Sequence, residues 1–262
     1  MDDLLAVMEE AARSAGAAAL HVRGEGVSAE LKADRSPVTR ADRLAEAIIL
    51  ERLAAAFPGI PVIAEEAHSA GLVPDRLGSR FFLVDPIDGT REFVAGRDEF
   101  TVNIALVADG RPAAGMVFVP ALDELYVGSP EGAFRSAGTG GPEPISVRAP
   151  DGPLVALASR SHRTEATDDW LARHGVSTVL AVGSSLKFCR LAEGAADLYP
   201  CLGTTMEWDT AAGQAVLEAA GGRVTQPDGS PLRYGKRGRA GLPDFRNPAF
   251  VAFAALSLPS TS

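Results

Sequence analysis

The second half of the chain alternates between short apolar runs and amphipathic segments, and this alternation limits the fold more than any other feature. Apolar runs at 154–159, 177–182 and 196–200 predict strands, and the segments at 164–174, 184–194 and 209–220 predict helices. Strands that alternate with helices pair at least partly in parallel and form one layer of an α/β structure. We therefore expect an α/β half over residues 151–262.

The first half follows a different pattern. Residues 4–22 and 41–57 have apolar residues at helical spacing, and Pro58-Gly59 ends the second helix. The predicted strands that follow are at 60–64, 81–84, 101–107, 112–119 and 123–127, with a turn at 129–132 before a further strand. Gly and Pro are frequent from Gly138 to Pro153. We place the boundary there and expect residues 1–150 to form an α+β half packed against the other.

Charge and cysteine content exclude several classes of protein. The net charge is −9 and the pI is about 5.0, which argues against a broadly basic face that would wrap a nucleic acid polymer. No stretch approaches the ~18 apolar residues of a transmembrane helix, and the acidic N-terminus is unlike a signal peptide. Two cysteines, Cys189 and Cys201, fit a reducing compartment. We expect a cytoplasmic protein, a monomer or homodimer, and peripheral inner-membrane association stays open.

Acidic residues gather at three places where a predicted strand ends or a helix begins. These segments are Val62-Ile63-Ala64-Glu65-Glu66, Leu83-Val84-Asp85-Pro86-Ile87-Asp88-Gly89-Thr90 and Glu207-Trp208-Asp209-Thr210-Ala211-Ala212-Gly213. Carboxylates that converge from rigid elements repel one another unless a cation neutralises them, and oxygen ligands favour Mg²⁺ or Mn²⁺ over zinc. The three segments together therefore predict a divalent cation site.

The middle segment also predicts a phosphate site. Pro86 fixes a turn that lets Asp85 and Asp88 face the same ion, with the carbonyl of Ile87 between them. Gly89 lets backbone approach a ligand closely, and the amides of Gly89 and Thr90 would bind an anion at a helix start. A metal beside such amides is an arrangement for phosphoryl transfer.

Each motif taken alone has an ordinary structural explanation. A Glu-Glu pair is usually a solvated turn, an Asp-Gly pair is usually a turn, and Trp-Asp-Thr is usually a helix N-cap. Three such motifs in the same strand-end or helix-start context make these explanations much weaker. By contrast, the stretch Gly138-Thr139-Gly140-Gly141 is predicted to be a loop, because no helix follows it as a nucleotide-binding fingerprint requires.

The sequence resembles the inositol-monophosphatase-like, lithium-sensitive metal phosphatases. Its DPIDGT run (85–90), the upstream EE pair (65–66) and WDTAAG (208–213) are that superfamily's signature. Within it, the runs that look most like the bacterial 3′(2′),5′-bisphosphate nucleotidases are REF (91–93), EFTVNIALV (99–107), ASRSH (158–162), GSSLKFCRLAEGAADLYP (183–200) and EWDTAAGQAV (207–216). The resemblance covers nearly the whole chain and implies the layered αβαβα fold of these sugar phosphatases.

The resemblance also implies roles for individual residues. The Mg²⁺ ligands would be Glu65, Asp85, the Ile87 carbonyl, Asp88 and Asp209, holding two to three ions. Thr90 and Asp42, from the PVTRAD segment (37–42), would orient and deprotonate the attacking water, with Glu65 also counted as catalytic. From its position alone, Asp42 would be interpreted as an acidic residue in the first turn of a helix. A second ion would neutralise charge on the leaving ribose oxygen.

Substrate contacts are implied at Gly89, Thr90, Ser184 and Lys187, and more weakly at Ser161 and His162. Lys187 would otherwise be an ordinary solvated helix lysine. One position departs from the family pattern, because the Arg that usually follows Tyr199-Pro200 is Cys201 in this chain. Cysteine cannot supply the bidentate phosphate contact of an arginine. Arg190 and the basic stretch from Arg233 to Arg239 are the candidates to replace it.

The expected function is that of a Mg²⁺-dependent phosphomonoesterase. The resemblance implies hydrolysis of 3′-phosphoadenosine 5′-phosphate (PAP) to AMP and phosphate, which clears a by-product of sulfate assimilation. An inositol- or sugar-phosphate phosphatase on the same scaffold is the enzymatic alternative. A non-catalytic phosphate or nucleotide sensor is the alternative from another class, and it would have no need for Thr90 and Asp42.

Overall fold

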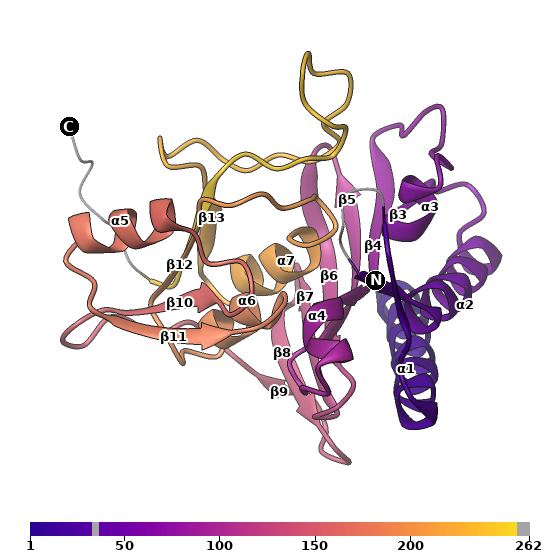
Figure 1. Cartoon of the computed structure of the whole chain (residues 1–262), viewed down its shortest axis with the longest axis horizontal. Helices are drawn as coiled ribbons and strands as arrows, with labels where there is room; N and C mark the ends of the chain where they lie inside the picture. Colours follow the sequence, from indigo (N-terminus) through magenta and orange to yellow (C-terminus); the bar gives the residue numbers. More distant parts are fainter. Residues whose placement is uncertain (33–36, 256–262) are drawn as a thin grey trace.

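Two β-sheets and three groups of helices stack in five layers. The computed structural model describes residues 1–32 and 37–255. From the right of Figure 1 to its left, the layers are α1 and α2, a seven-stranded sheet, α6 and α7, a five-stranded sheet, and α5. This is the αβαβα arrangement that the resemblance implies, and that prediction of the fold is confirmed.

The seven-stranded sheet carries most of the first half. Its strands lie in chain order: β3 (Val62–Ala64), β4 (Arg80–Asp88), β5 (Thr101–Ala108), β6 (Arg111–Val119), β7 (Glu124–Ser129), β8 (Gly132–Ala137) and β9 (Glu143–Pro144). Neighbours pair antiparallel except β3 and β4, which run parallel. The parallel pair brings the C-terminal ends of β3 and β4 side by side.

Helices cover both faces of this sheet, so its central strands are apolar on both sides. Phe82 and Val84 of β4 pack toward α1 (Asp2–Glu25) and α2 (Arg40–Ala56). Phe81 and Leu83 of the same strand pack toward α6 (Leu186–Ala192) and α7 (Ala211–Ala219). Successive side chains in a strand alternate between faces, which is why 81–84 reads as a continuous apolar run.

The five-stranded sheet belongs to the second half. Its strand order is β11 (Thr178–Val182), β10 (Val155–Ser159), β12 (Leu198–Cys201), β14 (Phe250–Phe253) and β13 (Arg223–Thr225). Strand β10 pairs parallel with β11 and β12, as the alternation of strands and helices predicts, and β14 pairs antiparallel with both of its neighbours. Helix α5 (Glu165–Arg173) packs on its outer face through Trp170 and Leu171.

Two glycines let α7 lie directly on the seven-stranded sheet. A Cβ atom at Gly115 of β6 would lie 2.5 Å from the Ala212 carbonyl oxygen, and one at Gly128 of β7 would lie 2.4 Å from the Val216 Cα. Both distances are shorter than side-chain contacts allow, so only glycine permits this approach. The helix that follows Asp209 is thereby held against the sheet that carries Asp85.

Several short elements were not predicted. They are the antiparallel pair of β1 (Ala29–Leu31) and β2 (Pro37–Thr39), the single-turn helix α3 (Glu65–Ser69), and β9, β13 and β14. The single-turn helix α4 (Thr90–Val94) begins where the sequence predicts a helix start. Strand pairing is consistent with a boundary after residue 150, which stays a prediction. Over residues 1–32 and 37–255, no helix combines the length and apolarity that crossing a membrane requires.

Candidate active site

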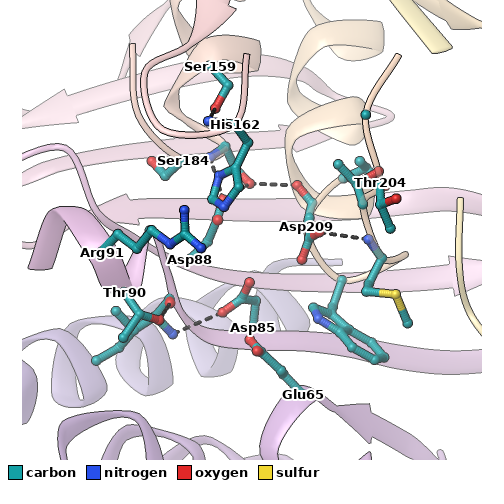
Figure 2. A pocket seen from close by; sticks show the side chains of 18 of the residues that line it. Glu65, Asp85, Asp88, Thr90, Arg91, Ser159, His162, Ser184, Thr204 and Asp209 are labelled. Carbon is teal, nitrogen blue, oxygen red and sulfur yellow. Dashed lines mark hydrogen bonds between the residues drawn. The ribbon is translucent and has the colours of Figure 1, made fainter. Parts of the chain in front are cut away.

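A cavity of about 830 Å³ lies between the two halves at the ends of β3, β4 and β12. Figure 2 shows Glu65, Asp85, Asp88 and Asp209 directed toward one region of it. The predicted residues that line it are Glu65, Asp85, Ile87, Asp88, Gly89, Thr90, His162, Ser184, Lys187 and Asp209. The fold therefore brings the three acidic segments to one place.

A β-bulge places Asp85 and Asp88 on the same side of their strand. Asp85 pairs with Asn103 of β5 and Asp88 pairs with Thr101, so β4 has one more residue than β5 between the two pairs. In a regular strand, residues three positions apart point to opposite faces, and the extra residue reverses this. Pro86 lies within the bulge, where its missing N–H costs no ladder hydrogen bond.

Glu65 and Asp209 reach the same region from other elements. Ala64 of β3 pairs with Val84 of β4 in parallel register, so Glu65 leaves the sheet beside Asp85. Asp209 lies in the turn before α7, where its Oδ2 accepts the Met206 N–H at 2.7 Å. Neither position depends on a long flexible loop.

Each of the four carboxylates uses one oxygen for a hydrogen bond within the protein. The acceptor atoms are Glu65 Oε1 (from Lys32 Nζ, 2.7 Å), Asp85 Oδ1 (from Ile87 N, 3.0 Å), Asp88 Oδ2 (from Ser185 N, 2.5 Å) and Asp209 Oδ2 (from Met206 N, 2.7 Å). The second oxygen of each accepts no hydrogen bond from the part of the chain that the structure describes. These oxygens are the ones available to an ion.

Burial and mutual repulsion shift the titration of this cluster. Burial, followed by the negative charges of Glu65, Asp88 and Asp209, raises the pKa of Asp85 well above its usual range. Burial and the charges of Asp88 and Glu65 do the same to the pKa of Asp209. Burial raises the pKa of Glu65 to about 7, although Lys32 opposes the shift. A divalent cation would relieve the repulsion, so the donor set fits such an ion.

The side chains are not closed around a common centre. Among residues 1–32 and 37–255, no three His, Cys, Asp or Glu side chains are arranged to hold an ion directly. Part of the reason is Lys32, which follows β1 and donates to Glu65 and to Glu66 over 2.7 and 2.6 Å. A cationic side chain thus neutralises the Glu65 end of the cluster, and no sequence motif predicted this contact.

Thr90 and Asp42 form the hydroxyl–carboxylate pair that the resemblance implies. Thr90 Oγ1 lies 3.2 Å from Asp42 Oδ1 and 3.2 Å from the Ile87 carbonyl oxygen. Asp42 Oδ2 accepts from the backbone and the hydroxyl of Thr39, which completes a capping box at the start of α2. Burial raises the pKa of Asp42, and the bonds from Thr39 and Thr90 limit that rise. Asp42 is therefore both a helix cap and a partner of Thr90.

Ser185 connects the two halves at the carboxylate cluster. Its hydroxyl lies 2.7 Å from Asp88 Oδ2 and 2.7 Å from the Asp209 carbonyl oxygen, and it accepts from Asn103 Nδ2 at 2.9 Å. Ser185 lies directly before α6, whereas Asn103 lies on β5. Ser185 was not predicted, because a serine beside Ser184 has no distinguishing sequence signal.

The predicted substrate contacts divide into two groups. Gly89, Ser184, Lys187 and His162 line the cavity, and Gly89 has a φ of 87° that favours glycine. Lys187 is 4 % exposed and donates to the Ser184 carbonyl, so it is not a solvated lysine. Burial lowers its pKa, and Asp88 opposes that change. Ser161 donates to Glu92 and is not among the described residues that line the cavity.

The candidates to replace the family's arginine are not in the cavity. Arg190 is paired with Glu124 at 3.0 Å and Glu193 at 2.7 Å, and it does not line the cavity. None of the described residues from Arg233 to Arg239 lines the cavity. The interpretation of these residues as substitutes is therefore wrong. Two other arginines, Arg91 and Arg246, line the cavity.

Further residues line the cavity without having been predicted as site residues, although some of them belong to the quoted motifs. They are Lys32, Pro37, His68, Ser69, Arg91, Glu92, Ser159, Ser185, Phe188, Tyr199, Gly203, Thr204, Thr205, Met206, Trp208, Thr210, Pro243 and Arg246. Most come from loops that contact the cavity only after both halves have packed together.

Comparisons with known proteins agree with this geometry. The family model described as "Inositol monophosphatase family" matches residues 1–247. A curated relative from Salmonella typhimurium, "3'(2'),5'-bisphosphate nucleotidase CysQ", is 43% identical over 241 residues, which cover 91% of this chain and 95% of the relative. Its counterpart from Escherichia coli strain K12 is 42% identical with the same coverage.

Solved structures give the same result. The crystal structure of CysQ from Bacteroides thetaiotaomicron matches with a TM-score of 0.79 and 36% identity, covering 96% of this chain and 97% of that one. An IMPase from Thermotoga maritima matches with a TM-score of 0.77 and 26% identity, covering 97% and 92%. The sequence signature, the five layers and these matches agree: the chain belongs to the inositol monophosphatase family of phosphatases.

Proposed function

We propose that this chain is a Mg²⁺-dependent phosphomonoesterase that hydrolyses PAP to AMP and phosphate. The observation that carries the proposal is the convergence of Glu65, Asp85, Asp88 and Asp209 on one cavity wall, with Thr90 paired to Asp42 beside them. The relatives at 42–43% identity carry the name of a bisphosphate nucleotidase, which supports the choice of substrate.

The metal ligands in this proposal are Glu65, Asp85, the Ile87 carbonyl, Asp88 and Asp209. Their support is the free oxygen that each of the four carboxylates retains and the repulsion that an ion would relieve. Oxygen-only ligands match Mg²⁺, and the family resemblance implies two to three ions. When bound, Mg²⁺ supplies charge neutralisation and lowers the pKa of a water molecule.

Thr90 and Asp42 orient the attacking water and accept its proton in this proposal. The Thr90 hydroxyl donates toward Asp42 Oδ1, so its oxygen lone pairs can accept a hydrogen bond from water. A proton that reaches Thr90 can pass on to Asp42, whose burial and raised pKa make it a better proton acceptor than an exposed aspartate. Thr39 holds the other oxygen of Asp42 and fixes its orientation.

Gly89, Ser184, Lys187 and His162 are the proposed substrate contacts on the other cavity wall. Figure 2 shows Ser184 and His162 near Asp88, opposite Glu65. Lys187 lines the cavity, its ammonium lies 5.1 Å from the centre of the Tyr199 ring, and it interacts electrostatically with Asp88. A buried cation beside an acidic cluster would pair with a substrate phosphate once the ions neutralise the carboxylates.

An inositol- or sugar-phosphate phosphatase is the second candidate, and Cys201 is the observation that favours it. Phosphate release from PAP, 3′-phosphoadenosine 5′-phosphosulfate, inositol monophosphates and fructose 1,6-bisphosphate, each with Mg²⁺, tests both candidates. We expect the highest kcat/KM for PAP, and no release in excess EDTA. The family resemblance implies inhibition by Li⁺. A preference for inositol phosphates would favour the second candidate, and binding of PAP without any turnover would favour a sensor.

We propose the cytoplasm as the site of this activity. Cys189 is buried and Cys201 lines the cavity, and both are free thiols. Unpaired cysteines are typical of a reducing compartment.

A further inference from the structure

Cys201 ends strand β12 and lines the cavity at the position where the family pattern has arginine. Burial raises the pKa of its thiol, although Tyr199 and Lys187 oppose the shift. A neutral thiol is at best a weak hydrogen-bond donor and cannot bind a phosphate dianion as a guanidinium does. A substrate with a second phosphate therefore needs another cation on this side of the cavity.

Arg246 reaches the cavity from the segment that runs beside the Cys201 loop. The backbones of Met206 and Arg246 form an antiparallel bridge, and Asn247 N donates to the Thr205 carbonyl at 2.9 Å. The Arg246 Nη2 donates to Thr204 Oγ1 at 3.1 Å. Thr204 belongs to the loop that follows Cys201, so this bond holds the guanidinium against that loop, in the cavity that Cys201 also lines.

The guanidinium of Arg246 has no carboxylate partner among the residues that the structure describes. Over residues 1–32 and 37–255, no carboxylate lies within ion-pair distance of Arg246. The contrast with the nearby basic residues is clear, because Lys32 is paired with Glu65 and Lys236 is paired with buried Glu207 at 2.7 Å. A half-buried guanidinium held by a hydroxyl retains donors for an anionic ligand.

Arg91 lines the cavity as well, but on another side. Figure 2 shows Arg91 close to Asp88 and Thr90, whereas Thr204, the partner of Arg246, lies across the carboxylate cluster. A phosphate that reacts at the carboxylates would lie between the two arginines. Arg91 therefore lies on the side where the phosphate reacts, beside Asp88 and Thr90. Arg246 lies on the opposite side, where it would contact a group of the substrate farther from the reacting phosphate.

We propose that Arg246 binds the second, non-reacting phosphate of the substrate and replaces the arginine that is missing at position 201. This inference rests on the proposed function, and it narrows the substrate class to monoesters with a second anionic group separated from the first, such as PAP. Arg246 is then a specificity-determining residue, and it acts on substrate affinity rather than on the attacking water.

The test compares Arg246→Leu with Arg233→Leu in the full-length protein. Arg233 is exposed and lies outside the cavity lining, so its replacement removes the same charge without touching the site. Substrates are PAP and 3′-AMP, which carries the reacting phosphate but no 5′-phosphate. For Arg246→Leu, we expect kcat/KM for PAP to fall roughly ten- to a hundredfold, mainly through a higher KM. We expect kcat/KM for 3′-AMP to change less than about twofold. The kcat/KM of Arg246→Lys for PAP should lie between those of the wild type and Arg246→Leu, since lysine keeps the positive charge but lacks the planar guanidinium.

Two further measurements separate this inference from the proposed function and from misfolding. Cys201→Arg added to Arg246→Leu should restore the KM for PAP, and calorimetric affinity for AMP should fall in Arg246→Leu by a factor similar to that in KM. Suppose that the wild type hydrolyses PAP. If Arg246→Leu then changes kcat/KM for PAP and for 3′-AMP equally, or changes neither value, Arg246 does not bind the second phosphate. If the wild type releases no phosphate from PAP, the proposed substrate is wrong, and the inference fails with it.

Discussion

Thr90 Oγ1 lies 3.2 Å from Asp42 Oδ1, although 48 positions separate the two residues in the chain. One carboxylate therefore serves two purposes: Asp42 Oδ2 caps helix α2 through Thr39, and Oδ1 faces Thr90. Because the cap fixes the carboxylate, the orientation of Thr90 depends on the correct start of α2. The proposed catalytic pair and the cap of α2 thus share a single side chain.

Replacing Thr90 tests this pair. Thr90→Val keeps the shape of the side chain but removes the hydroxyl, so we expect kcat to fall by about 10²-fold or more, with KM changed much less. Thr90→Ser keeps the hydroxyl and should retain most of the activity. Steady-state phosphate release with Mg²⁺ measures both variants. Equal activity of the valine and serine variants would show that the hydroxyl has no part in the reaction.

Removing one charge from the carboxylate cluster should separate activity from stability. Asp209→Asn and Asp88→Asn each keep the side-chain volume, so we expect both to lose most of kcat while remaining folded. For Asp209→Asn in EDTA we also expect a higher Tm than the wild type, because burial and repulsion disfavour the wild-type carboxylate. Added Mg²⁺ should raise the Tm of the wild type much more than that of the variant.

Turnover near the wild-type level at saturating Mg²⁺ would remove the altered residue from the ligand set. A suitable control is Asp228→Asn, since Asp228 lies in an exposed turn where it accepts only from Ser230. This variant should leave both turnover and the response of Tm to Mg²⁺ unchanged.

The strands and helices of the second half and the three acidic segments could be predicted from local periodicity or from a compact motif, whereas the layered αβαβα arrangement was implied by the family resemblance. Apolar alternation located β10, β11, β12 and the helices between them, and DPIDGT predicted that Asp85 and Asp88 face the same ion, through a turn at Pro86 where the structure has a β-bulge. These features need information from only a few neighbouring residues. The prediction of Asp42 as part of the site came from family resemblance, and its helix position alone indicated only a cap.

Residues that reach the site through tertiary packing could not be predicted in the same way. Lys32 contacts Glu65 from the end of a three-residue strand, and Ser185, just before α6, bonds to Asp88 and Asn103 on two neighbouring strands of the seven-stranded sheet. Nothing in the sequence near Arg246 distinguishes it from the basic residues at 233–239. The choice of Arg190 as a phosphate ligand was wrong because its sequence position beside Lys187 gave no sign of Glu124, which lies 66 positions away.

The pH dependence of stability should report on Glu65. Burial raises the pKa of Glu65 to about 7 in the folded chain, whereas an unfolded glutamate titrates near 4.5. The folded state then binds more protons between these values, so the free energy of unfolding in EDTA should fall as pH rises from about 4.5 to 7. Urea unfolding at several pH values should show this decrease in the wild type and a smaller one in Glu65→Gln.

Added Mg²⁺ should make the free energy of unfolding fall less steeply as the pH rises, since a cation favours the ionised carboxylate. Identical pH profiles for wild type and Glu65→Gln in EDTA would show that Glu65 titrates at its ordinary pKa in the folded protein.

Asp197 provides a stability prediction away from the cavity. Its carboxylate accepts two bonds from Arg148, both at 2.9 Å, and one from the Val155 N–H at 2.7 Å. Burial opposes ionisation, but the Arg148 hydrogen bonds outweigh it and lower the pKa of Asp197. Asp197→Asn should reduce the free energy of unfolding by roughly 1.5–3 kcal/mol at neutral pH, with kcat unchanged.

The loss of stability caused by Asp197→Asn should disappear in acid. A lowered pKa in the folded state means that the stabilisation is present above the pKa of the unfolded chain and is lost as pH falls through the folded value. Urea unfolding of both proteins across that range measures the difference. A constant difference at all pH values would assign the effect of the substitution to packing instead of charge.

The glycine contact between α7 and the seven-stranded sheet has a consequence for ion selectivity. Gly115 touches Ala212, only three residues beyond Asp209, so the separation between Asp209 and Asp85 is limited by two backbones in contact. Mg²⁺ requires ligands at 2.0–2.1 Å in near-octahedral geometry, whereas Ca²⁺ accepts 2.3–2.6 Å and more varied arrangements. A methyl group at Gly115 or Gly128 would push the helix outward and enlarge the ligand cage. In the proposed metal site, discrimination between ions of different radius would therefore depend partly on residues that never touch the ion.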